Sequence, residues 1–251
     1  MKSNLKRLDF IDLIRGITIL SMVAYHTCFD LVYLFNVPLS WFPSTATDCW
    51  QQSICITFIF LAGLSSCLSR SNLKRGIRLL LLAVLVSLGT FLVFPDELIV
   101  FGILNFMGLA CILTALLRPL LNKCPALIGM LVCFGLFLLT KELPSGWLGI
   151  GGWHLIQMPM SLYSAPGMFI FGLPSRDFFS ADYFPLIPWL FLFWTGYFFW
   201  RQFGERVSKL SLMRVRFLPV NWFGRHTIWV YVLHQPVIFA VLYAMRTLGF
   251  F

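Results

Sequence analysis

This chain of 251 residues is 59% hydrophobic and only 12% charged, and its mean hydropathy is +0.84. Soluble domains carry about 25% charged residues, so the composition excludes a water-soluble protein and indicates a membrane-embedded one. The formal net charge of +9 raises nucleic acid as a partner. The basic residues, however, gather between apolar segments, which is typical of a topology signal, and we expect no nucleic-acid binding.

Seven segments have the apolar character of transmembrane helices, which need about 20 residues each. We expect them at residues 12–35, 50–69, 77–94, 98–117, 125–140, 183–200 and 226–246. The sequence therefore predicts an all-α, polytopic membrane helical bundle, with one domain over residues 1–251.

The distribution of lysine and arginine orients this bundle. Most of the 19 basic residues lie in the N-terminal stretch and in the connections after the second, fourth and sixth spans. Cytoplasmic loops are enriched in such residues. We therefore expect a cytoplasmic N-terminus and a C-terminus on the outer side.

Residues 146–182 are apolar but contain many glycines and prolines. An eighth span here would move the most basic connection to the outer side, against the positive-inside rule. We expect an external segment that is re-entrant or interfacial and partly covers the bundle. Non-helical backbone at membrane depth survives only when it packs on protein or lines a cavity.

The first span carries ionisable side chains, which are costly in a membrane and are usually functional. An α-helix turns about 100° per residue, so Asp12, Arg15, His26 and Asp30 fall on one stripe of this helix. His26 is a candidate general base, which the Asp30 carboxylate would orient. Its structural alternative is a hydrogen bond between helices.

Arg15 has two interpretations as well. It either reaches the cytoplasmic interface with Asp12 as its partner or binds a phosphate or carboxylate of a substrate.

A second polar site lies in the last span, where Pro236 follows His234 and Gln235. These two side chains could face the first site or serve as structural hydrogen-bonding groups. The four histidines are too dispersed to predict a metal site.

Several segments resemble a known family. Residues 8–26, LDFIDLIRGITILSMVAYH, resemble the first helix of the transmembrane acyltransferase superfamily, in which ten residues separate an arginine from a histidine, as between Arg15 and His26. One branch fits best: bacterial proteins similar to the heparan-alpha-glucosaminide N-acetyltransferase catalytic domain. The segments that match this branch are His26–Asp30, Phe60–Ser65, Phe101–Leu104, Asp182–Trp189 and Gly224–Pro236.

The resemblance implies transfer of an acetyl group from cytoplasmic acetyl-CoA to a sugar amine or hydroxyl on the outer side. Arg15 would anchor the donor and His26 would deprotonate the acceptor. His234, as a catalytic residue, and Gln235 would bind the acceptor or stabilise the tetrahedral oxyanion, and Asn105 would contact the acceptor. Asn105 stands where this branch often carries a histidine, so this chain departs from the pattern there.

The expected partners follow from the same resemblance. They are membrane lipids, the acyl-CoA donor and a glycan or glycolipid acceptor, with no permanently bound cofactor and with homo-oligomerisation left open. The expected location is the inner (cytoplasmic) membrane of a bacterium. The alternative function is a transporter, or a solute- or lipid-binding membrane protein, that uses the same polar stripe without an acyl donor.

Overall fold

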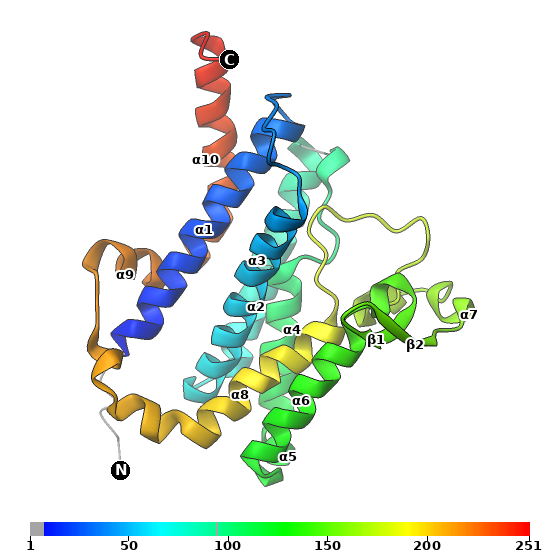
Figure 1. Ribbon diagram of the computed structural model, residues 1–251, viewed down its shortest axis with the longest axis vertical. Coiled ribbons are helices and arrows are strands. Elements are labelled where there is room, and N and C mark those ends of the chain that lie inside the picture. The colour runs from blue at the N-terminus through cyan, green and yellow to red at the C-terminus, as the bar shows by residue number, and fades with distance from the viewer. Residues whose placement is uncertain (1–7, 94) are drawn as a thin grey trace. The chain divides into compact units, whose positions relative to one another are not determined.

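The computed structural model describes residues 8–93 and 95–251 and divides the chain into two compact units. The first, here called the terminal unit, joins the chain up to Phe58 with Glu205–Phe251. The second, the central unit, comprises Ile59–Gly204. Both are built from α-helices, and one pair of short strands lies in the central unit (Figure 1).

The terminal unit is built around α1. Its helices are α1 (Asp9–Tyr33), the first half of α2 (Thr45–Leu68), α9 (Leu218–Arg225) and α10 (Thr227–Thr247), with a 3-10 turn at Ser211–Arg214. The other α-helices are α3 (Asn72–Val93), α4 (Ile103–Leu116), α5 (Arg118–Lys123), α6 (Ala126–Thr140), α7 (Met160–Tyr163) and α8 (Leu186–Lys209). The strands are β1 (Trp147–Ile150) and β2 (Trp153–Gln157), which pair antiparallel.

Two glycines bring the backbones of α1 and α9 into direct contact. A Cβ atom on Gly224 would overlap the carbonyl oxygen of Asp12, and one on Gly16 would overlap that of Val220. Small residues permit such close approach between membrane helices. Because the earlier residue of α1 meets the later residue of α9, the two helices cross antiparallel.

Helix α10 runs in the same direction as α1, and the two helices lie side by side (Figure 1). His26 contacts His234, and further along both helices Phe35 packs in one cluster with Leu242. Two parallel helices that both cross a membrane must be separated by an odd number of crossings. If α1 and α10 both cross the membrane, the helices from α1 to α10 therefore make an odd number of crossings.

Each of the seven predicted spans coincides with a helix. Five helical segments of the described chain are long and apolar enough to cross a membrane, namely α1, α2, α3, α10 and the segment Ala126–Ser145, which consists of α6 and the 3-10 turn after it. The other two predicted spans correspond to α4, which has only 14 residues, and α8. Half or more of the residues of both helices are buried, so protein rather than lipid surrounds them. The chain is therefore an all-α membrane protein, and the count of seven stays a prediction.

No helix between residues 146 and 182 is longer than four residues. Two tyrosine hydroxyls hold this stretch together: Tyr163 donates to the Leu143 carbonyl at 2.5 Å, and Tyr183 to that of Phe169 at 2.5 Å. Burial raises the pKa of the Tyr163 hydroxyl, so this group stays protonated and can donate at neutral pH. The expected irregular segment is present, and its position outside the membrane stays a prediction.

Candidate functional site

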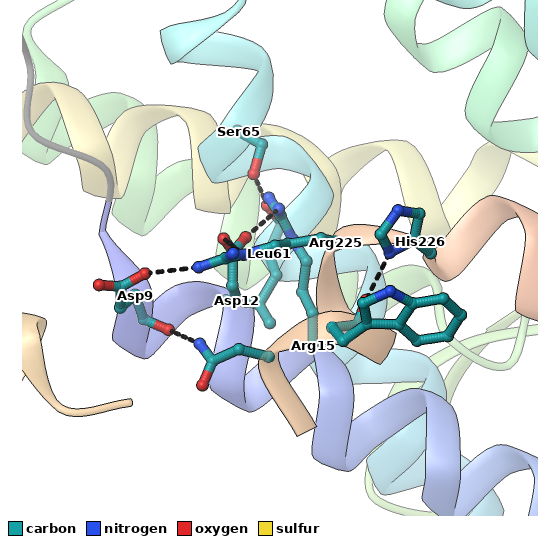
Figure 2. Close-up of polar contacts among 9 residues, drawn as sticks. Asp9, Asp12, Arg15, Leu61, Ser65, Arg225 and His226 are labelled. Carbon is teal, nitrogen blue, oxygen red and sulfur yellow. Dashed lines mark hydrogen bonds and ion pairs between the residues drawn. The ribbon is translucent and has the colours of Figure 1, made fainter. Parts of the chain in front are cut away.

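Charged side chains at the N-terminal end of α1 meet the end of α9 (Figure 2). Arg225 donates through Nη2 to Asp9 Oδ1 at 3.0 Å, and its Nε lies 3.5 Å from Asp12 Oδ2. Arg15 Nη1 lies 3.4 Å from Asp12 Oδ1. We call these four residues the α1–α9 cluster. Its two guanidinium groups balance its two carboxylates, so a phosphate that binds Arg15 must compete with Asp12.

Asn221 secures this cluster and was not singled out by the sequence. The residue is 1% exposed. Its Nδ2 donates to the Asp9 carbonyl at 2.6 Å, and its Oδ1 accepts from the Phe217 amide at 2.7 Å. The sequence feature that could have indicated this role is the position of Asn221, a single amide residue in a short amphipathic segment just before Gly224 and Arg225. Because both the nitrogen and the oxygen of this buried amide are hydrogen-bonded, Asn221 fixes the start of α9 on α1.

The second group of polar side chains lies further along α1, where it meets α10. The imidazole rings of His26 and His234 are 4.9 Å apart between centroids and are inclined by 60°. His234 Nδ1 contacts the carbonyl oxygen of Tyr231 in its own helix. Because a carbonyl only accepts, Nδ1 carries the hydrogen, and neutral His234 presents the lone pair of Nε2.

Asp30 belongs to the same group and is completely buried. Gln235 Nε2 donates to Asp30 Oδ1 at 2.8 Å, across 205 residues of sequence. Gln235 Oε1 is buried and has no hydrogen-bond partner among the residues that the structure describes. We call His26, Asp30, His234 and Gln235 the histidine site. That Asp30 orients His26 stays a prediction.

The structure thus brings four of the six predicted site residues together in the terminal unit. Arg15 precedes His26 by 11 residues, which is about 16 Å along α1. Asn105 lies in the central unit, where its Oδ1 accepts from the Gly102 amide at 3.1 Å and caps the start of α4. This bond gives Asn105 a structural role, and its contact with a substrate stays a prediction.

The chemistry open to the histidine site is proton transfer. It combines two imidazoles, one buried carboxylate and one amide, all on two parallel helices of one unit. Within the described residues, no group of three or more His, Cys, Asp or Glu side chains could hold a metal ion. A neutral imidazole can accept a proton from a nucleophile near neutral pH.

One family model matches this chain. It is described as heparan-alpha-glucosaminide N-acetyltransferase, catalytic, and it matches residues 7–236. No curated protein and no solved structure matches the chain. Because the family model spans nearly the whole sequence, the chain belongs to this family, and it is a membrane acetyltransferase-like protein.

Proposed function

From this family membership, we propose that the chain transfers an acetyl group from acetyl-CoA to an amine or hydroxyl group of a sugar. The observation that supports this best is the His26–His234 pair, with ring centroids 4.9 Å apart. Two imidazoles so close do not both carry a proton readily, because like charges repel at this distance. One of them therefore remains neutral and can act as a base.

His26 is the base in this proposal. It takes the proton of the acceptor group as the nitrogen or oxygen attacks the thioester carbonyl. A C–N or C–O bond forms, the C–S bond breaks, and the CoA thiolate leaves and takes up the proton. The buried carboxylate of Asp30, one helical turn from His26, stabilises the imidazolium that forms in between.

Arg15 anchors the anionic end of acetyl-CoA in this proposal. It lies about 16 Å from His26 along α1, and a long, thin donor can bridge that distance. Anchoring requires a CoA phosphate to replace Asp12 as the partner of Arg15. The α1–α9 cluster supplies a second guanidinium, Arg225, which also contacts Asp12. The donor would arrive from the cytoplasm, and the acceptor would stand at the outer side.

The test is acetyl transfer by His26→Ala in purified, membrane-reconstituted protein. A general base contributes about 10²- to 10⁴-fold to the rate, so we expect a loss of that size with an unchanged unfolding temperature. His154→Ala is the matched control, because His154 contacts Glu142 in the central unit. A wild-type rate in His26→Ala contradicts the assignment. Binding of acetyl-CoA that survives Arg15→Ala contradicts the role of Arg15.

A further inference from the structure

The connection between α8 and α9 exposes apolar and basic side chains together. It comprises residues 210–217 and is here called the α8–α9 linker. Arg214 and Arg216 are exposed. They alternate with large apolar residues that are 47–60% exposed, namely Leu210, Leu212, Val215 and Phe217. An exposed apolar patch of this kind marks an interaction surface.

The linker is fixed against α1. Its 3-10 turn contacts α1, and Met213 in this turn is buried. The Phe217 amide donates to Asn221 Oδ1 at 2.7 Å, and Asn221 Nδ2 donates to the Asp9 carbonyl at 2.6 Å. Asp9 is the first residue of α1. The linker is therefore an ordered surface that ends close to the start of α1.

The region around the linker carries an excess of positive charge. Residues 205–222 contain four basic residues and one acidic residue, Glu205, which pairs with Lys209 at 3.0 Å. Among the residues that the structure describes, neither Arg214 nor Arg216 forms an ion pair. A partner of the linker must therefore offer negative charge to these arginines and apolar surface to the side chains between them.

The start of α1 is the end of this helix that we expect on the cytoplasmic side. The stretch before α1 contains Lys2, Lys6 and Arg7, and cytoplasmic segments next to a span are enriched in such residues. This expectation is independent of the arginines in the linker. The cytoplasmic leaflet carries anionic lipids, which attract basic residues close to the membrane surface. The surface nearest to the linker thus combines negative headgroups with an apolar interior.

We propose that the α8–α9 linker binds anionic phospholipids of the cytoplasmic leaflet. Arg214 and Arg216 contact the phosphate and the headgroup, while Leu212 and Phe217 enter the outer part of the acyl chains. Interfacial segments that combine basic residues with Phe, Trp and Leu bind membranes in this way. A second copy of the chain fits this face poorly, because like positive charges would meet. Lipid binding here is independent of acetyl transfer.

The test compares phosphatidylglycerol with phosphatidylcholine of the same acyl chains. Each lipid is titrated into the detergent-purified protein, and native mass spectrometry gives its Kd. We expect the wild type to bind phosphatidylglycerol at least about fivefold more tightly than phosphatidylcholine. Arg214→Gln combined with Arg216→Gln should remove this preference by weakening phosphatidylglycerol alone. The unfolding temperature should not change, because both side chains are exposed.

The matched control is Arg70→Gln combined with Lys74→Gln. It removes the same charge from two exposed residues of the central unit, at a connection that we also expect in the cytoplasm, and it should keep the preference. Equal losses in the two double variants would mean that bulk positive charge is sufficient, and they would overturn the proposal. An equal Kd of the wild type for both lipids, or displacement of phosphatidylglycerol by equimolar coenzyme A, would overturn it as well.

A second pair of variants tests the apolar contact. Phe217→Ser should raise the Kd of both lipids about threefold or more, because the Phe217 ring leaves water on binding. Phe179→Ser is the control, since Phe179 is 62% and Phe217 60% exposed, but Phe179 lies in the central unit. An unchanged Kd in Phe217→Ser shows that the linker does not enter the lipid and contradicts the proposal.

Discussion

At the residue scale, Asp30 is the most constrained group of the histidine site. Its carboxylate is completely buried in a helix with membrane-spanning length, where charge is expensive unless it is hydrogen-bonded. The amide of Gln235 supplies one such bond at 2.8 Å. Two side chains of different helices are thereby tied together next to the two imidazoles. Asp30 therefore has a structural role that is independent of any catalytic one.

This contact predicts a coupling between Asp30 and Gln235. A hydrogen bond to a charged group contributes about 1.5–3 kcal/mol, so Gln235→Leu should lower the free energy of unfolding by about that amount. In Asp30→Asn the charge is gone, and the same Gln235→Leu change should cost less. The measurement is a double-mutant cycle on chemical unfolding in one detergent. Additive effects of the two substitutions would mean that the bond contributes nothing.

At the element scale, the histidine site depends on how α9 and α10 sit against α1. Helix α9 crosses α1 antiparallel through Gly16 and Gly224, and α10 then runs parallel to α1. Any shift of α9 along α1 would move His234 relative to His26, because only His226 separates the two helices in sequence. The α1–α9 contact is thus a positioning element for the site.

Gly224→Ala tests this contact. The added methyl group would overlap the Asp12 carbonyl oxygen, and overpacking of this kind costs about 1–3 kcal/mol. We expect a lower unfolding temperature and a reduced transfer rate. Gly135→Ala in α6 is the matched control, because its Cβ would meet no atom within 4 Å and alanine favours the helix. Equal unfolding temperatures for the two variants would show that α1 and α9 do not need this close contact.

The sequence predicted these elements well because apolar length and helical spacing are local properties. It located the seven α-helices of 14 or more residues in the described chain and placed His26 and Asp30 on one face of α1. Helix ends were less predictable. The fourth span was expected from residue 98, but α4 begins at Ile103, whose amide donates to the Asp182 carboxylate at 3.0 Å. That contact joins positions 79 residues apart, which no local pattern contains.

Contacts between helices could not be predicted from the sequence, because they too join positions that are far apart in the chain. Arg201 counted only as a topology signal, yet its guanidinium donates to the carbonyls of Leu121, Asn122 and Cys124 at the end of α5. Arg225 likewise joins the α1–α9 cluster. A single sequence shows the chemical type of each side chain and the helix face on which it lies. It does not show which other helix that side chain contacts.

At the whole-molecule scale, the terminal unit constrains the topology. The parallel arrangement of α1 and α10 requires an odd number of crossings if both span the membrane. The start of α10 then lies on the same side as the start of α1. The basic residues before α10 lie in the last turns of α8 (Arg206 and Lys209) and in the 3-10 turn that follows (Arg214). By the positive-inside rule we expect the side on which α1 and α10 start to be the cytoplasmic one.

Cysteine labelling with a membrane-impermeant maleimide tests this topology. Ser175 and Ser211 are both exposed, and Cys49, which is also exposed, is first replaced by serine. We expect Ser175→Cys to be labelled in intact cells, and Ser211→Cys only after permeabilisation. The 3-10 turn that begins at Ser211 contacts α1, so its accessibility also reports the side on which Arg15 lies. Labelling of Ser211→Cys alone would place Arg15 outside and would exclude a cytoplasmic donor at this end of α1.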